Sequence, residues 1–254
     1  MTNDISVVLA GWPYDDEAGL QVRWITADDG TRRIQLRVDL GLLQMEVVDR
    51  PDGERPHGFS SLLEYYRQEA EAYRGRHGWY EGFELCPADC GALRQEALQY
   101  YHRRIARMAL QDYAGAVADA EHNLEILNLL KAFAKNREDW LLSEQYRAFI
   151  VSHRVQSLAL QHLSQDQAKA ALIEVERGLR QVREIFAEHD RLEELDESPE
   201  LSALEELRRK IEGRYCISRR ERLQLLLDDA LRREDPEAAA ELRAQLRELE
   251  PEDD

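Results

Sequence analysis

The chain has 254 residues, and its 51 acidic side chains outnumber its 34 basic ones, which gives a formal net charge of −17. An electric field of this sign repels polyanions, so the composition argues against a nucleic-acid-binding protein. The 43% hydrophobic content can fill a core, and 13 Gly and 7 Pro with 33% charged residues favour a globular, helix-dominated chain.

The first residues lack the basic segment of a signal peptide, and their apolar run, residues 7–10, is too short for a signal core. No stretch approaches the length of a membrane span. The three cysteines, Cys86, Cys90 and Cys216, cannot form a complete disulfide framework, and free thiols suit a reducing compartment. We therefore expect a cytoplasmic protein without a membrane partner.

Apolar and polar residues alternate with period two through residues 20–48. The sequence DDGT at residues 28–31 interrupts the alternation, and its glycine tolerates the positive φ of a tight turn. The pattern predicts a β-hairpin with a third strand near residues 43–48. Two prolines and two glycines in residues 50–58 then end the sheet.

Apolar residues at helical spacing follow from residue 59 onward. Ser60 or Ser61 is expected to cap the first helix, and Gly75 and Gly78 to end it. A short aromatic loop, residues 79–83, precedes long amphipathic helices that continue to residue 186. This loop is expected either to plug the helical core or to expose an aromatic anchor.

An internal repeat lies within the helical region. Residues 104–111 (RIARMALQ) align with residues 154–161 (RVQSLALQ) at an offset of 50, which predicts stacked helical hairpins. Residues 112–120 resemble the turn and second helix of a tetratricopeptide (TPR) repeat. Arg103 and Arg104 stand where that family has an apolar residue and a glycine, so an irregular helical bundle remains the alternative.

An acidic stretch, residues 189–198, leads into a helix that Ser198 caps and Pro199 begins. Residues 186–254 carry 22 acidic and 12 basic side chains, so the excess acidity of the chain lies mainly there. Charge complementarity therefore suits this terminal region to a basic protein partner.

Two short helices are predicted at the end of the chain. Ser218 and Glu221 form a capping box for the first helix, and Asp235 caps the second, with Pro236 at its first position. Each helix has one apolar face. Two helices of about 14 residues are too small to be stable alone, so this hairpin must dock on another surface.

The predicted hairpin carries apolar and small residues at defined places on both helices, together with an acid at the turn. These positions are Leu223, Leu227, Ala230, Asp235, Ala238, Ala239, Leu242, Arg243, Leu246 and Leu249. Here the sequence resembles the UVR motif, a helical hairpin shared by the UvrB and UvrC subunits of bacterial excision nuclease and by ClpC-associated adaptors. Pro236 stands where that family usually has an aromatic residue, which removes an anchor of UvrB–UvrC docking.

The resemblance implies contact between paired hairpins of two proteins, including self-association. Residues 34–53 also resemble an uncharacterised bacterial family of UVR-motif proteins, which implies no chemistry. We expect a non-enzymatic adaptor with no cofactor, whose partner is a UvrB/UvrC-like subunit, a Clp-type chaperone or a second copy. The residues expected to bind the partner are Leu223, Leu227, Ala230, Leu231, Ala239, Leu242, Arg243, Leu246 and Leu249.

A ligand- or metal-binding enzyme is the alternative, with a pocket between the N-terminal strands and the aromatic loop. It would use Arg37, Asp39 or Cys90. Arg33, Gln35, Arg37 and Asp39 alternate onto one face of the hairpin, where they bind a partner or merely solvate the sheet.

Other candidate sites are weaker. Cys86 and Cys90, with His77 or His102, could surround zinc, but the cysteine spacing is not the usual two-residue gap, and no metal is expected. The seven histidines are scattered singly, with no nucleophile and base at a telling spacing. Direct DNA binding would need a local basic patch, such as Arg103, Arg104 and Arg107.

The sequence therefore predicts a mainly α (α+β) fold in four segments. Residues 1–58 form a small β-module, and residues 59–186 form a TPR-like helical body. Residues 187–216 form an acidic linker with a connecting helix, and residues 217–254 form the terminal hairpin.

Overall fold

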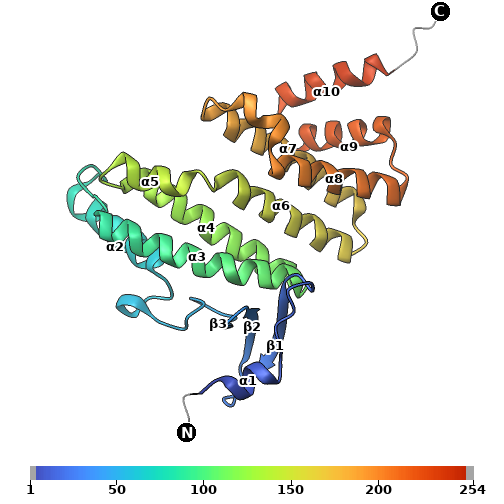
Figure 1. Ribbon diagram of the computed structural model, residues 1–254. Coiled ribbons are helices and arrows are strands. Elements are labelled where there is room, and N and C mark those ends of the chain that lie inside the picture. The colour runs from blue at the N-terminus through green and yellow to red at the C-terminus, as the bar shows by residue number, and fades with distance from the viewer. Residues whose placement is uncertain (1–3, 250–254) are drawn as a thin grey trace, which may run out of the picture. The chain divides into compact units, whose positions relative to one another are not determined.

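The computed structural model describes residues 4–249 and is 67% helical, with one small antiparallel sheet near the N-terminus (Figure 1). This confirms the predicted mainly α fold with an N-terminal sheet. The chain divides into an N-terminal unit, Met1–Ile150, and a C-terminal unit, Val151–Asp254. Within residues 4–249, no helix combines the length and the apolar character that a membrane crossing requires.

Three strands form the sheet in the order β1-β2-β3: β1 (Gln21–Thr26), β2 (Arg32–Val38) and β3 (Gly41–Glu46). The β1–β2 turn closes with the Ala27 amide donating to the Thr31 carbonyl at 2.9 Å, and Gly30 has φ of 78°. The period-two alternation thus predicts the hairpin correctly. The third strand begins two residues earlier than expected.

One face of the sheet packs on a helix, because the alternation places large apolar side chains there. Ile34 is fully buried, Leu36 and Met45 nearly so, and all three cluster with Ala106. Ala106 belongs to α3 (Pro87–Ala109), so the sheet and the helices share a core.

A short helix, α1 (Ser6–Ala10), precedes the sheet, and the 3-10 helix η1 (Pro56–Gly58) follows it. The next helix is α2 (Leu62–His77). The Ser61 hydroxyl accepts from the Glu64 amide at 3.1 Å at its start, and Gly78 ends it with φ of 86°. Of the two serines proposed as the cap, Ser61 therefore fills the position.

The predicted repeat corresponds to two helical hairpins. The first is α3 with α4 (Tyr113–Phe133), joined where the Asp112 carboxylate accepts from the Gly115 amide at 3.2 Å. The second is α6 (Arg147–Ser164) with α7 (Ala168–Glu188). The short helix α5 (Arg137–Glu144) lies between the two hairpins in the chain.

Small residues bring the paired helices together. Ala116 and Ala120 of α4 and Ala171 of α7 are fully buried. Gly178 approaches α6 so closely that a Cβ atom there would stand 2.6 Å from both methyl groups of Val155. These contacts explain why small residues recur at matching positions of the repeat.

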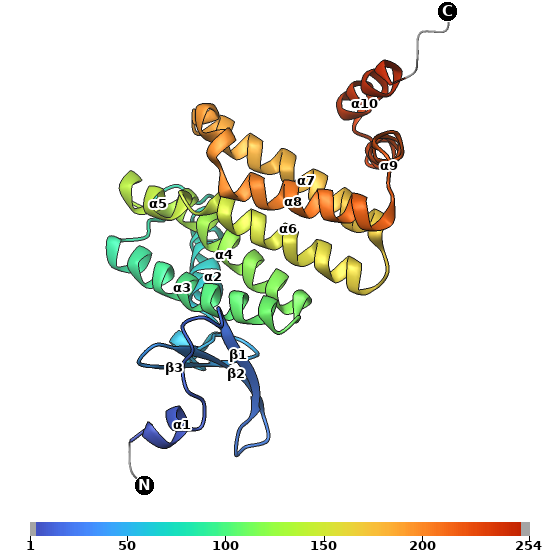
Figure 2. The same cartoon turned by 45° about the vertical axis from the view of Figure 1, so that its right-hand side comes forward.

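The C-terminal unit continues with the exposed 3-10 helix η2 (Leu192–Glu197) and with α8 (Pro199–Tyr215), whose first turn is capped by Ser198 as predicted. The last two helices are α9 (Arg219–Arg232) and α10 (Pro236–Glu248). Figures 1 and 2 show α9 between α8 and α10, so α10 is the outermost helix of this unit.

The boundary between the two units falls inside α6. The sheet packs on α3 and so joins the helices of the N-terminal unit. The terminal hairpin packs on α7 and so joins the C-terminal unit. Packing between residues distant in the chain determines which unit an element joins. Changes in composition along the sequence do not show this packing.

Candidate functional site

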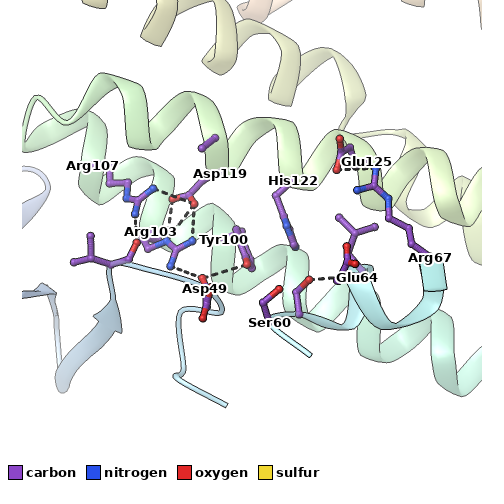
Figure 3. A pocket seen from close by; sticks show the side chains of 14 residues that line it. Asp49, Ser60, Glu64, Arg67, Tyr100, Arg103, Arg107, Asp119, His122 and Glu125 are labelled. Atoms are coloured by element: carbon purple, nitrogen blue, oxygen red, sulfur yellow. Dashed lines mark hydrogen bonds and ion pairs between the residues drawn. The ribbon is translucent and has the colours of Figure 1, made fainter. Parts of the chain in front are cut away.

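A polar pocket of about 360 Å³ opens in the N-terminal unit, where the segment after β3 and the start of α2 meet α3 and α4 (Figure 3). It does not include the aromatic loop of residues 79–83. Charged and hydroxyl side chains dominate its wall. The lining residues are Val47, Asp49, Ser60, Ser61, Leu63, Glu64, Arg67, Tyr100, Arg103, Arg107, Ala118, Asp119, His122 and Glu125.

Arg103 lies at the back of the pocket and connects three elements. Its Nη2 atom is 2.7 Å from Oδ1 of Asp119 on α4, and its Nη1 atom donates to the carbonyls of Glu46 and Asp49 at 2.8 Å each. Only 3% of Arg103 and 1% of Asp119 are exposed. Because the buried charges of both side chains are paired and hydrogen-bonded, this is a structural ion pair, and it fixes the segment after β3 on the helices.

Arg107 adds a second tie beside the first. Its guanidinium donates to the Gly115 carbonyl at 2.7 Å and to the Val47 carbonyl, and its Nη1 atom is 3.3 Å from Asp119. Burial lowers the pKa of Arg107. Arg103, Arg104 and Arg107 are all buried, so the basic patch that direct DNA binding would need is not exposed.

A fully buried carboxylate, Glu96, lies behind the pocket wall. It accepts from the Leu62 and Leu63 amides at 2.7 and 3.1 Å, and its Oε2 atom is 3.6 Å from Arg50. The amides at the start of a helix otherwise attract anions. Because the chain fills this position with its own carboxylate, the start of α2 offers no anion site.

His122 is the titratable ring on the pocket wall. Its Nε2 atom lies 3.0 Å from Oε1 of Glu96, and its ring stacks on Tyr100 with the ring centres 3.6 Å apart. Burial raises the pKa of Tyr100 to about 12, and its hydroxyl donates to the Asp49 carbonyl. His122 is therefore held by a carboxylate and an aromatic ring, not directed at a nucleophile.

The two cysteines proposed as zinc ligands differ in environment. Cys86 is exposed at the start of α3, whereas Cys90 is fully buried, and burial raises the pKa of the Cys90 thiol to about 11. Asp89 accepts from the Cys86 amide and from the Tyr66 hydroxyl. Among residues 4–249, no three His, Cys, Asp or Glu side chains gather as metal ligands would.

The second face of the sheet is not a free polar surface. Arg37 is 7% exposed, and it donates to the carbonyls of Trp12 and Gly41 at 2.9 and 2.7 Å, and also to those of Val38 and Asp39. Gln35 is similarly buried and bonds Gln44 on β3. Arg37 thus stabilises the β2–β3 turn, and Asp39 contributes only its carbonyl to these contacts.

The aromatic loop divides between the two expected roles. Tyr80 and Phe83 contact Phe133 at the end of α4, with ring centres 5.5 and 5.1 Å apart, so they extend the core. Trp79 remains 62% exposed.

The terminal hairpin is the second candidate site, and its two predicted caps are present, although of the predicted capping box the structure records only the Ser218 half. The Ser218 hydroxyl accepts from the Glu221 amide at 3.1 Å, and the Asp235 carboxylate accepts from the Ala238 amide at 3.1 Å. The Glu221 carboxylate also lies 3.3 Å from Lys169 of α7.

The hairpin docks on α7 through an ion pair. Arg177 donates three hydrogen bonds to Asp229 of α9 from its Nε and Nη2 atoms, and the shortest contact, from Nη2 to Oδ1, is 2.7 Å. Asp229 is 5% exposed. The expectation that this hairpin needs a supporting surface is therefore met within the C-terminal unit.

The nine residues expected to bind a partner fall into two groups. The first group is buried inside the hairpin or against its support: Leu223, Leu227, Ala230 and Ala239. The second group is exposed or half-buried: Leu231, Leu242, Arg243, Leu246 and Leu249. Only the second group offers surface to another molecule.

The buried carboxylate of Glu96 and the burial of Arg37 against backbone carbonyls were not predicted from the sequence. Glu96 bonds amides 33 and 34 residues away, and Arg37 bonds the Trp12 carbonyl 25 residues away, so no local pattern indicates either contact.

Comparisons with protein-family models, with curated proteins and with solved structures gave no match.

Proposed function

We propose that this protein is a non-enzymatic binding protein whose C-terminal hairpin, α9 with α10, pairs with a helical surface of another protein. The observation that carries the proposal is the incomplete burial of apolar residues on the outermost helix pair. Leu231 is 49% exposed at the end of α9, and Leu242, Leu246 and Leu249 of the second helix and its end are only half-buried.

The supported side and the open side of the hairpin differ in composition. Toward α7, the Arg177–Asp229 pair and buried leucines hold α9 in place. Leu242 and Leu246 pack on the Leu227, Ala230 and Ala239 cluster with part of their surface still exposed, and Leu231 at the end of α9 is 49% exposed. Apolar surface left uncovered along a helix pair in this way suits packing on a second helical partner. Residues 217–249 carry 7 basic and 8 acidic side chains, so apolar contact contributes more to recognition here than net charge does.

The resemblance to the UVR motif suggests which partners to test. They are a UvrB/UvrC-like subunit, a Clp-type chaperone and a second copy of this chain. The α3–α4 hairpin resembles a TPR repeat in its Asp112–Tyr113 turn, small residues pack between the helices of both α3–α4 and α6–α7, and both hairpins provide further helical surface. An adaptor role in excision repair or in a Clp-type complex is consistent with these features.

The test uses two matched substitutions at exposed leucines of the C-terminal unit. Leu231→Arg changes the proposed surface, whereas Leu192→Arg changes η2, where the side chain is 55% exposed. Purified full-length protein is measured for self-association by sedimentation equilibrium and for binding to purified UvrB, UvrC and ClpC-type proteins. We expect Leu231→Arg to weaken one of these associations about tenfold or more and Leu192→Arg to leave it unchanged. Equal affinity of both variants and the wild type for every partner would remove the proposal.

A further inference from the structure

The N-terminal segment lies on the second face of the sheet, opposite α3. Figures 1 and 2 show the sheet between α3 and α1. Trp12 lies under the guanidinium of Arg23 at 4.1 Å, Tyr14 lies 5.7 Å from that of Arg37, and Gln21 donates to the Asp15 carbonyl at 2.6 Å. Residues 12–15 are therefore held in place by the strands.

The helix before this anchor is apolar, and apart from the half-buried Leu9 its side chains are exposed. None of the five residues of α1 (SVVLA) is buried, and Val7 is 84% exposed. An apolar helix gains stability from burying its side chains, and a fully exposed one is marginal at this length. The contacts that stabilise α1 are thus incomplete within residues 4–249.

More exposed apolar side chains surround Arg37 at the neighbouring end of the sheet. Leu40, in the β2–β3 turn, is 87% exposed. Leu20 precedes Gln21, whose register partner is Arg37, so Leu20 lies beside Val38. Together these side chains form what we call the N-terminal apolar patch: Val7, Val8, Tyr14, Leu20, Val38 and Leu40.

The exposed charges bordering this patch have one sign. Residues 4–22 contain no Lys, Arg or His. The acids of this segment and of the β2–β3 turn are all exposed: Asp4, Asp15, Asp16, Glu17 and Asp39. Arg37 is buried and directs its guanidinium at backbone carbonyls, and Arg23, another cation on this face, is half-buried over the Trp12 ring.

The apolar surface and its acidic border together indicate what kind of molecule binds the patch. An anionic membrane or a nucleic acid would be repelled by the carboxylates, and two copies meeting through the same patch would bring like charges together. A protein segment with apolar side chains flanked by Lys or Arg would satisfy both the apolar surface and the acidic border. We propose that the N-terminal apolar patch is a docking surface for a basic amphipathic segment of another protein, separate from the surface on α9 and α10.

The test uses a fluorescent helical peptide of about 18 residues, built only of Leu and Lys with Leu on one face. Its affinity for the full-length protein is measured by anisotropy at about 0.15 M salt. Val7→Asp and Leu40→Asp change the two most exposed patch residues, which contribute little to the fold because they are 84% and 87% exposed. Val48→Asp is the matched control, since Val48 is 73% exposed just beyond β3, at the other end of the sheet.

We expect the peptide to bind, and each patch substitution to raise its Kd about tenfold, while Val48→Asp leaves it unchanged. Each substitution adds a negative charge, so purely electrostatic binding of the Lys-rich peptide would strengthen. An unchanged or lower Kd in the patch variants would overturn the proposal. A dimer that Val7→Asp and Leu40→Asp dissociate, or binding to phosphatidylcholine–phosphatidylglycerol vesicles that they abolish, would also overturn it.

Discussion

At the scale of single residues, two neighbouring arginines on α3 have opposite environments. Arg103 is fully paired with Asp119 and with two backbone carbonyls. Arg104 is 1% exposed, and its Nε and Nη1 atoms have no hydrogen-bond partner among the described residues. The rings of Tyr101 and Phe149 lie 5.5 and 5.7 Å from its guanidinium. Burial lowers the pKa of Arg104 to about 10, which means that the fold disfavours its charge.

The same substitution at the two positions should therefore act in opposite directions. Arg103→Met leaves Asp119 buried with Arg107 as its remaining cation, so we expect the free energy of unfolding to fall by about 3 kcal/mol. Arg104→Met removes a buried, incompletely bonded guanidinium, so stability should stay unchanged or rise by about 1 kcal/mol or more. Urea denaturation of both variants tests this. A similar decrease in the free energy of unfolding in both variants would contradict the conclusion that Arg103 is paired and Arg104 is not fully hydrogen-bonded.

The cysteines give a second prediction at this scale. Cys86 and Cys216 are exposed, whereas Cys90 is fully buried with its thiol pKa raised to about 11. The thiolate is the reactive form, so at pH 8 iodoacetamide should label Cys86 and Cys216 in the native protein and Cys90 only after unfolding. Mass spectrometry of the alkylated peptides reads this out. Labelling of native Cys90 at the rate of Cys86 would contradict the structure.

Sequence reasoning at the residue scale succeeds for local hydrogen bonds. The caps at Ser198, Ser218 and Asp235 bond amides three residues away, and all three are confirmed. It fails for Arg103 and Arg37, where charge suggests exposure. Their partners come from segments distant in the chain, and only the packed fold determines which charges are buried.

At the scale of elements, the helical repeat depends on one close contact in the C-terminal unit. Gly178 of α7 faces Val155 of α6 with no room for a side chain. The repeat was detectable because both hairpins need small residues between their helices. The exposure of α1 cannot be predicted from the sequence, since its four apolar residues form the same pattern whether they are buried or exposed.

Alanine substitutions at two helical glycines of this unit test the close contact. Gly178→Ala would place its Cβ 2.6 Å from the Val155 methyl groups, and we expect about 1–3 kcal/mol of destabilisation from overpacking. Gly213 of α8 has nothing within 4 Å of an added Cβ, so Gly213→Ala should stabilise by about 0.5–1 kcal/mol. Thermal unfolding measures both. Stabilisation by Gly178→Ala would show that α6 and α7 are not in contact there.

At the scale of the whole molecule, the chain carries two separate apolar surfaces, one in each unit. The N-terminal apolar patch has an acidic border, whereas the hairpin α9–α10 is nearly neutral and presents half-buried leucines. The excess acidity of the terminal region lies outside the helical hairpin: residues 188–200 around η2 carry 7 acidic and 1 basic side chains, and residues 250–254 carry 4 acidic ones. We infer that the two proposed surfaces select different partners, as the proposed adaptor role requires.

The two compact units group elements by shared cores, whereas the four predicted segments follow changes in composition along the chain. Composition marks where a linker begins, but it does not show which core an element joins. Ala106 unites the β-module with α3, and the Arg177–Asp229 pair unites the terminal hairpin with α7. Elements and caps could therefore be predicted from local patterns, whereas the grouping of elements could not.

The most direct test of the central claim is amide hydrogen exchange of the full-length protein, free and bound to the partner identified by the Leu231→Arg comparison. Exchange reports local opening, so an amide covered by a partner exchanges more slowly. We predict that slowing on binding is concentrated in α10 and the end of α9, residues 228–249. Unchanged exchange in these residues, with slowing confined to other helices, would contradict the claim that the C-terminal hairpin is the binding surface.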